Sequence, residues 1–285
     1  MQRFTLIILA TVVLTVAAFQ PAVAADSELA SRTASAHAED TPVATPAATT
    51  PLDVRVHSRT AVYTSIDGQK IEGWMAWPAG ASIEGLPALI VIHEWWGLND
   101  NIRKASERLA AEGYVTLAVD LYRGKTGDVP KQAMKLMQEL NAETEAGREN
   151  LAAAYDYLET VVRAERIGVI GWCLGGRWSL QAALRLPEKI DATVIYYGGV
   201  PDDKEQLATL KMPILGLFAG TDPVVPPDTV VAFRDALAAL GKDADIHIYP
   251  DAKHAFANPS GMAYDEVAAA DAWEKTTVFL AEHLQ

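Results

Sequence analysis

The order of apolar and polar positions predicts a chain that alternates short strands with amphipathic helices. Six short apolar runs are typical of buried strands, and they span Ala88–Ile92, Val115–Val119, Ile167–Ile170, Ala192–Tyr196, Ile214–Phe218 and Ile246–Tyr249. Several of these runs are apolar almost throughout. That pattern is expected for strands of a parallel sheet whose two faces are both covered by helices.

Helical patterns fill the intervals between these runs. The segment NDNIRKASERLAAEG begins with Asn and ends with Gly113, and PDTVVAFRDALAALG ends in the same way with Gly241. Ala263–Leu284 predicts a long amphipathic helix at the end of the chain. Upstream, TAVYTSIDGQKIEGWMAWP predicts two strands joined at Asp67-Gly68, a typical hairpin turn. Together these patterns predict one three-layer α/β domain over Leu52–Gln285, with an N-terminal hairpin and a mostly parallel central sheet.

The first 51 residues differ in composition from the rest. Arg3, an apolar run over Leu6–Phe19 and the small residues Ala22-Val23-Ala24 are typical of a secretion signal, which we assign to residues 1–24. The run is shorter than the roughly 20 apolar residues that span a bilayer, so we expect no membrane span after cleavage. Residues 25–51 are rich in Ala, Thr and Pro, which predicts a flexible tether. We therefore expect a periplasmic or secreted protein.

Charge and composition narrow the class of partner. The formal net charge is −13 at pH 7. Non-specific nucleic-acid binding requires a basic surface, so we expect no nucleic-acid partner. Half of the residues are hydrophobic, which supports a sizeable core. Cys173 is the only cysteine, so no internal disulfide forms. Its position in the fold therefore decides whether it is a buried structural residue or a reactive thiol. We expect a monomer that binds a small molecule.

The end of one predicted strand carries a nucleophile pattern. Gly171-Trp172-Cys173-Leu174-Gly175 fits the sharp strand-to-helix turn G-x-S-x-G of α/β-hydrolases, with cysteine in place of serine. A helix start favours the thiolate, because its N–H groups and dipole stabilise negative charge. Taken alone, the pattern fits a glycine-rich packing turn with a small buried cysteine equally well.

Two later strand ends add an acid and a base. Asp222 lies in a proline-flanked turn after Ile214–Phe218, and His254 lies in the loop after Ile246–Tyr249. The order nucleophile, acid, histidine is the one that the α/β-hydrolase fold imposes. Each residue alone also fits an ordinary turn or surface loop. Three ordered residues at three strand ends indicate a catalytic triad.

The loop after Ala88–Ile92 contains His93-Glu94, the start of a zinc-protease pattern. Gly97 stands where H-E-x-x-H needs its second histidine, and no other ligand cluster is evident, so we expect no metal and no cofactor. In an α/β-hydrolase this loop supplies one N–H of the oxyanion hole, and the residue after the nucleophile supplies the other. Here those residues would be Trp95 or a neighbour, and Leu174.

The segments HEWWGLN, DLYRG, GWCLGG, GTDPVVP and KHAFAN together resemble the dienelactone hydrolase family, whose members are carboxymethylenebutenolidase-like enzymes. The resemblance covers essentially the whole domain after the tether. It implies a single α/β-hydrolase domain that hydrolyses esters or lactones through a Cys-His-Asp triad. Cys173 would be the nucleophile, His254 the general base and acid, and Asp222 the residue that orients the imidazole. Glu94 would contact the thiol and help to form the thiolate when substrate arrives.

Substrate recognition departs from the family pattern. Family enzymes that act on dienelactones hold the substrate carboxylate with arginines. Here Arg123 directly follows Tyr122, one residue earlier than expected, and Asn258 stands at the position of a second arginine. Trp96 and Phe256 lie in the same loops, where flat rings supply apolar contact. We therefore expect Arg123, Tyr122, Trp96 and Phe256 to contact the substrate.

Three functions are compatible with these residues. The leading interpretation is an exported ester or lactone hydrolase that forms a cysteine acyl-enzyme. The same triad would serve a thioester or peptide hydrolase, which a panel of acyl donors separates. The third is an inactive scaffold that binds an acyl compound or a protein. Alkylation of Cys173 by iodoacetamide, with and without a slow substrate, distinguishes the scaffold from the enzymes.

Overall fold

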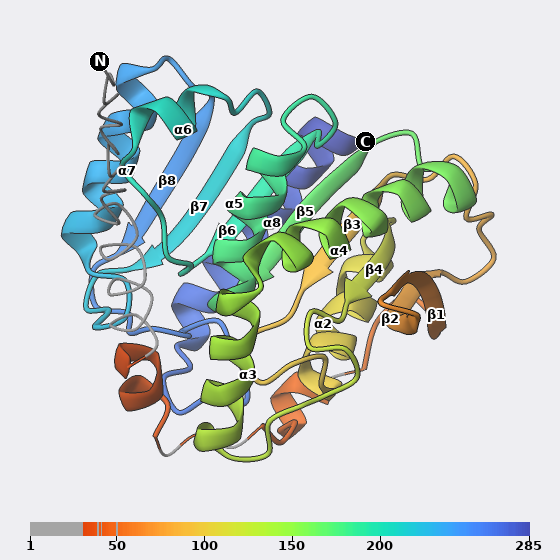
Figure 1. The fold of residues 1–285 in the computed structure, drawn as a ribbon, viewed down its shortest axis with the longest axis horizontal. Coiled ribbons are helices and arrows are strands. Elements are labelled where there is room, and N and C mark those ends of the chain that lie inside the picture. Colours follow the sequence, from red (N-terminus) through yellow and green to blue (C-terminus); the bar gives the residue numbers. More distant parts are fainter. Residues whose placement is uncertain (1–30, 39, 41, 50) are drawn as a thin grey trace, which may run out of the picture.

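The computed structural model describes residues 31–38, 40, 42–49 and 51–285. Among these residues an eight-stranded sheet runs in the order β1-β2-β4-β3-β5-β6-β7-β8 (Figure 1). β1 and β2 form an antiparallel hairpin, β2 is antiparallel to β4, and all other neighbours are parallel. The strands are β1 (Val56–Ile66), β2 (Gln69–Pro78), β3 (Ala88–Ile92), β4 (Val115–Val119), β5 (Ile167–Trp172), β6 (Ala192–Tyr196), β7 (Ile214–Ala219) and β8 (Ala244–Tyr249).

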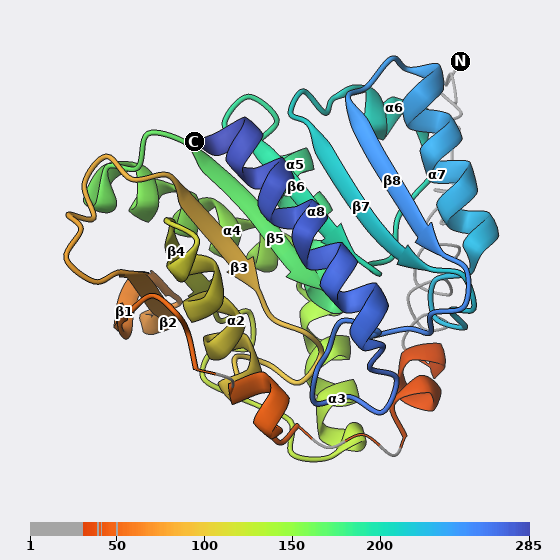
Figure 2. The same cartoon turned by 180° about the vertical axis from the view of Figure 1, so that it is seen from behind.

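Helices cover both faces of the sheet, so the predicted three-layer α/β fold is confirmed. α2 and α8 pack on one face, and α4, α5 and α7 pack on the other (Figures 1 and 2). The helices are α2 (Asp100–Ala111), α3 (Pro130–Ala142), α4 (Thr144–Tyr157), α5 (Leu174–Arg185), α6 (Lys204–Ala208), α7 (Pro227–Ala239) and α8 (Glu266–Leu284), with short helices η1 (Pro46–Thr49) and η2 (Leu158–Val162). None of the helices in the described part of the chain has the length and apolar character needed to cross a membrane.

The six predicted strands coincide with β3 to β8. Ala88–Ile92 and Val115–Val119 have the predicted bounds, and all their residues are buried because helices cover both faces. β5 continues through Gly171-Trp172, which brings the strand to the residue before Cys173. The hairpin turns at Asp67-Gly68, where φ is 51° and 78°, as a tight hairpin turn requires.

The last helix begins three residues later than predicted. The Asp265 carboxylate accepts the N–H groups of Val267 (3.1 Å) and Ala268 (3.0 Å), so Asp265 is the N-cap and Glu266 the first helical residue. The apolar pattern extends past this cap, which explains why it does not mark the helix start.

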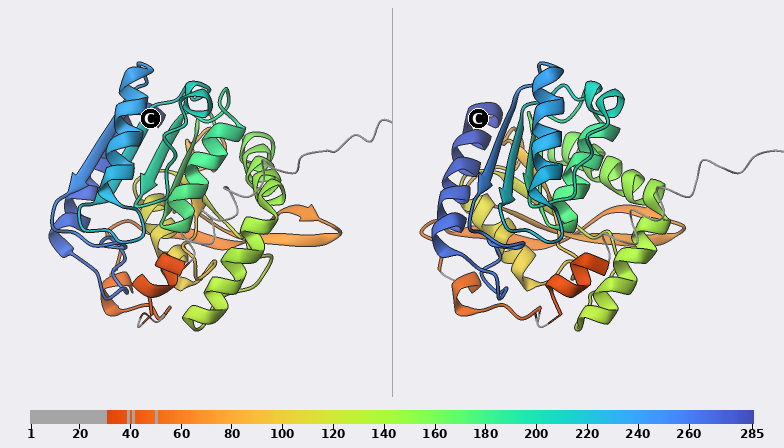
Figure 3. Two further views of the ribbon diagram at one scale, coloured as in Figure 1. Left: turned by 60° about the vertical axis from the view of Figure 1, so that its left-hand side comes forward. Right: turned by 90° about the vertical axis from the view of Figure 1, so that its left-hand side faces the viewer.

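Part of the Ala/Thr/Pro-rich segment packs against the domain. Residues 31–36 are helical, and this red helix lies at the end of the sheet where the parallel strands finish (Figure 3). The Thr45 N–H donates to Ser260 Oγ (3.0 Å), and Thr45 Oγ1 donates to the Pro259 carbonyl (2.8 Å). The segment is thereby joined to the loop after β8, which the prediction of a flexible tether did not anticipate. The predicted signal, residues 1–24, lies outside the described residues.

Candidate active site

Cys173 stands at the sharp turn between β5 and α5. Its backbone has φ 55° and ψ −114°, a strained conformation for a residue with a side chain, and its N–H donates to the Tyr196 carbonyl (3.0 Å). A Cβ on Gly171 would lie 2.3 Å from the Gly175 carbonyl oxygen, and a Cβ on Gly175 would lie 2.2 Å from the Ile92 carbonyl oxygen. The two glycines flanking Cys173 are therefore required by backbone contact.

The three predicted triad residues meet at this turn. His254 Nε2 lies 3.1 Å from Cys173 Sγ, and His254 Nδ1 lies 2.7 Å from Asp222 Oδ2. Because an ionised carboxylate only accepts, Nδ1 donates to Asp222 and Nε2 faces the sulfur. Asp222 Oδ1 also accepts the N–H groups of Val224 (2.7 Å) and Val225 (2.9 Å), which fix the carboxylate. This is the geometry of a nucleophile, its base and an orienting acid.

The electrostatics of the buried pair favour a thiolate on Cys173 and an imidazolium on His254. Burial by itself would raise the pKa of the thiol, but the charge and hydrogen bond of His254, and then the nearby His37, lower this pKa to about 6. Burial would likewise lower the pKa of His254, but the Cys173 charge and the Asp222 hydrogen bond raise it to about 10. Each charge stabilises the other, and the lowered pKa of the Cys173 thiol favours its ionised form at neutral pH.

Glu94 lies in the loop after β3 and is held by Asn258. Its Oε2 accepts a hydrogen bond from Asn258 Nδ2 (2.8 Å). Burial, followed by the charge of Cys173, raises the pKa of the Glu94 carboxyl to about 8. The carboxyl is therefore mostly protonated at neutral pH, which avoids a second negative charge near the thiolate. The structure pairs the thiol with His254 instead, and contact of Glu94 with the sulfur stays a prediction.

The two predicted oxyanion-hole residues occupy the expected positions, Leu174 at the start of α5 and Trp95 in the loop after β3. Leu174 is the first residue of α5, where a backbone N–H has no acceptor within the helix. Trp95 is fully buried, and its carbonyl accepts the Tyr122 hydroxyl (3.1 Å). Trp96 is also buried and packs on Trp95 with ring centroids 4.7 Å apart. The donation of these two N–H groups to an oxyanion stays a prediction.

Two of the expected substrate contacts are engaged elsewhere in the structure. The Arg123 guanidinium forms ion pairs with Asp67 (3.5 Å) and Glu143 (3.1 Å), in a hollow of about 270 Å³ that no triad residue lines. Phe256 is fully buried, and its ring packs edge-on against Tyr197 with centroids 5.3 Å apart. Phe256 therefore supports the site from within the core.

A larger cavity, of about 970 Å³, reaches neighbours of the triad, although no triad residue lines it. Its lining includes Glu94, Trp172, Tyr197 and Asn258, together with residues 51–56 before the hairpin. Trp172 directly precedes Cys173 in the chain, and the Tyr197 ring centroid lies 5.3 Å from that of His254, so the cavity reaches residues that adjoin the triad. Its volume is in the range of small-molecule sites, and its lining combines aromatic and polar groups.

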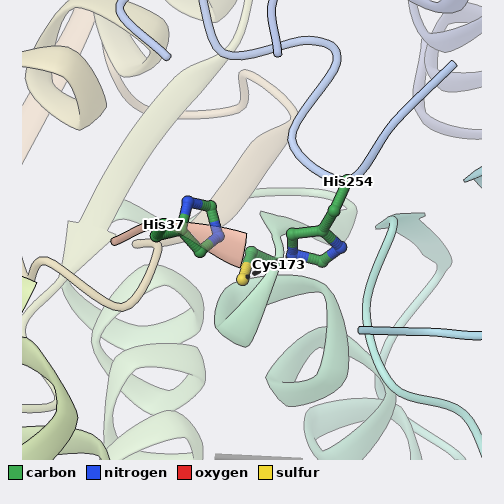
Figure 4. Close-up of side chains that lie close together, drawn as sticks. All are labelled: His37, Cys173 and His254. Atoms are coloured by element: carbon green, nitrogen blue, oxygen red, sulfur yellow. Dashed lines mark hydrogen bonds between the residues drawn. The ribbon is translucent and has the colours of Figure 1, made fainter. Parts of the chain in front are cut away.

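His37 is a site residue that the sequence analysis missed. It follows the helix of residues 31–36, is 3 % exposed, and its ring centroid lies 5.4 Å from that of His254. Figure 4 shows the His37 ring beside Cys173 and His254. His37 Nδ1 lies 2.7 Å from Asp40 Oδ2. The only sequence signal for this site is Asp40, three residues after His37. The Ala-, Thr- and Pro-rich composition of the segment predicts no packing and so hides this signal.

Comparison with known proteins identifies the family of this fold and site. The model of the dienelactone hydrolase family matches residues 71–284. The chain belongs to the dienelactone hydrolase family. A Saccharolobus solfataricus protein assigned as a carboxymethylenebutenolidase is 34% identical over 259 residues, covering 77% of this chain and 96% of the relative. An Escherichia coli K12 protein with the same assignment is 32% identical over 251 residues, covering 82% and 91%.

Solved structures of dienelactone hydrolase type share the fold. A Klebsiella pneumoniae protein assigned as a dienelactone hydrolase has a TM-score of 0.70 at 30% identity, covering 80% of this chain and 99% of the other. A dienelactone hydrolase-like promiscuous phosphotriesterase from metagenomic libraries has a TM-score of 0.73 at 24% identity, covering 81% and 99%. The chain is thus a dienelactone hydrolase family enzyme with an α/β-hydrolase fold, of the carboxylic ester or lactone hydrolase class.

Proposed function

We propose that this dienelactone hydrolase family member cleaves its ester or lactone through an acyl-enzyme on Cys173. The observation that carries the proposal is the hydrogen-bonded series of thiol, imidazole and carboxylate, with separations of 3.1 Å and 2.7 Å. The thiolate attacks the carbonyl carbon, and the carbonyl electron pair moves onto oxygen. The N–H groups of Leu174 and Trp95 would stabilise that oxyanion, and each such donor is worth about 3 kcal/mol.

His254 moves the proton in both halves of the reaction. Its imidazolium gives the Nε2 proton to the leaving alkoxide as the C–O bond breaks, which leaves a thioester on Cys173. Water then gives a proton to Nε2 and attacks the thioester carbonyl. The carboxylic acid departs, and the thiolate–imidazolium pair is restored. Asp222 keeps Nδ1 protonated throughout, so Nε2 always serves the sulfur side of the ring.

The preferred substrate has an uncharged acyl group. The Asn258 amide is committed to Glu94, and the Arg123 guanidinium is committed to Asp67 and Glu143. Asn258 carries no positive charge, and the charge of Arg123 is already paired. Neither residue is therefore available to bind a substrate carboxylate. Two lactones of equal size, with and without a carboxylate, test this inference. The neutral lactone should have the higher kcat/KM, and a carboxylate lactone favoured by about tenfold would contradict it.

Acid quenching of the purified enzyme during turnover of a hindered aryl ester tests the acyl-enzyme directly. Mass spectrometry should find one acyl group, on the peptide that contains Cys173. An acyl group on another residue would overturn the mechanism. Rates for matched oxygen esters, thioesters and peptides then rank the acyl donors, and we expect the oxygen esters and lactones to lead.

We also propose that the enzyme is exported. The apolar run Leu6–Phe19 and the small residues Ala22-Val23-Ala24 support this proposal. In cells that express the full chain, the enzyme recovered from the periplasm or medium should begin at Ala25. Uncleaved enzyme in the cytoplasm would contradict export. Cleavage at this position leaves His37 and Asp40 in the mature chain.

A further inference from the structure

We propose that His37, Cys173 and His254 form a binding site for a thiophilic divalent cation such as Zn²⁺. One donor atom of each residue lies within 4.8 Å of the other two (Figure 4). The three residues come from the N-terminal segment, the β5–α5 turn and the loop after β8, and none is more than 5 % exposed. This binding site goes beyond the proposed ester or lactone hydrolysis, because the cation would bind in the absence of substrate.

The donors are those that zinc prefers. One thiolate and two imidazoles are a usual set of three zinc ligands, with a fourth position left for water. Zinc–sulfur and zinc–nitrogen bonds of about 2.3 Å and 2.0–2.1 Å separate tetrahedral donors by roughly 3.4–3.6 Å. Cys173 Sγ and His254 Nε2 are already 3.1 Å apart, and the other separations stay within 4.8 Å. Side-chain adjustments of about 1 Å therefore complete the geometry.

Both histidines have the outer partner that metal-binding imidazoles usually have. His37 Nδ1 lies 2.7 Å from Asp40 Oδ2, and His254 Nδ1 lies 2.7 Å from Asp222 Oδ2. Because carboxylates accept, both Nδ1 atoms donate, so a metal that displaces the Nε2 protons would find both Nε2 lone pairs directed at the site. The two carboxylates thus fix the ring orientation needed for a shared cation.

His37 Nε2 lacks a well-formed hydrogen bond in the described part of the structure. It is buried and meets no hydrogen-bond geometry among the described residues, so its interaction with the site is the electrostatic one with Cys173, which lowers the pKa of the thiol. The His37 ring is held in place by packing against Trp95, with centroids 5.0 Å apart, while the Thr45 hydrogen bonds anchor the segment. A cation between the three residues would give this atom a direct bond.

Cation binding would switch the enzyme off. The metal replaces the proton between Cys173 and His254 and occupies the thiolate, so the ester carbonyl cannot be attacked. It also ties the N-terminal segment to the triad through His37. This inhibitory consequence rests on the proposed function, whereas the binding itself does not.

Competition between the reduced, chelator-treated full chain and a chromophoric chelator for Zn²⁺ tests the site. We expect one tight Zn²⁺ per chain, with an affinity that His37→Ala lowers at least tenfold and Asp40→Asn lowers about 10- to 100-fold. The matched control is His57→Ala, a β1 histidine whose ring packs on Trp77. This control should bind Zn²⁺ as the unaltered chain does.

Co²⁺ gives a readout that is independent of activity. A thiolate ligand produces a charge-transfer absorption, which should disappear in Cys173→Ser and weaken in His37→Ala. The absence of stoichiometric binding, or equal affinity in His37→Ala and the unaltered chain, would overturn the site even if the enzyme hydrolyses esters. Normal Zn²⁺ binding by a chain that hydrolyses no ester would overturn the proposed function alone.

Discussion

Replacing Asp222 with Asn isolates the role of the acid, because the two side chains have the same shape. In Asp222→Asn, Oδ1 still accepts the N–H groups of Val224 and Val225, which directs the new NH₂ group at His254 Nδ1. Two donors cannot face each other, so the neutral ring carries its proton on Nε2 instead. The lone pair that should face Cys173 is then missing.

The size of the effect follows from this change of tautomer. The same substitution in a serine protease lowers kcat about 10⁴-fold, or about 5.4 kcal/mol at 1.36 kcal/mol per factor of ten. A thiol depends less on its base than a hydroxyl does, because it ionises more readily. For the Asp222→Asn enzyme we therefore expect a loss of about 10²- to 10⁴-fold in kcat/KM, or about 3–5 kcal/mol.

The assay is kcat/KM for a small activated aryl ester near pH 7, with circular dichroism to verify folding. Asp228→Asn is the matched control, because Asp228 is an exposed acid in the first turn of α7. It should retain activity within about twofold. A folded Asp222→Asn enzyme that loses less than about tenfold would refute the role of Asp222 in setting the tautomer.

The thiol, the turn and the Glu94 hydrogen bond each give a further prediction. Because the pKa of Cys173 is lowered to about 6, its alkylation by iodoacetamide, followed by mass spectrometry, should slow as the pH falls through about 6. A rate that instead rises only through about pH 8.5 would indicate an unperturbed thiol. Gly175→Ala places a Cβ 2.2 Å from the Ile92 carbonyl oxygen. The substitution should lower the free energy of unfolding, measured in urea, by about 3 kcal/mol or more. An unchanged urea midpoint of unfolding would contradict this close packing. Asn258→Ala leaves buried Glu94 without its donor and should cost about 1–3 kcal/mol in the same assay, whereas unaltered stability would argue against the bond.

The sheet and the triad could be predicted because both depend on local pattern. β3 and β4 bury every residue, so their apolar runs end where the strands end. The carboxyl ends of parallel strands meet at one edge of the sheet. The order Cys173, Asp222, His254 along the chain was therefore enough to bring the three side chains together.

The missed features depend on contacts between distant segments. His37 belongs to a segment whose composition predicts no packing, and its burial depends on the loop after β8 and on Trp95. The pairing of Arg123 with Asp67 and Glu143 joins a loop, the hairpin turn and the residue before α4. Neither contact leaves a periodic pattern in the sequence.

Hydrolysis by purified Cys173→Ala enzyme tests the central claim most directly. The substitution removes only the sulfur, so a folded variant, verified by its thermal unfolding, keeps His254, Asp222 and the cavity. Hydrolysis of a small activated ester should fall to the rate of buffer alone, because no other group replaces the thiolate. Retention of more than about 1% of the original kcat/KM would contradict catalysis by Cys173.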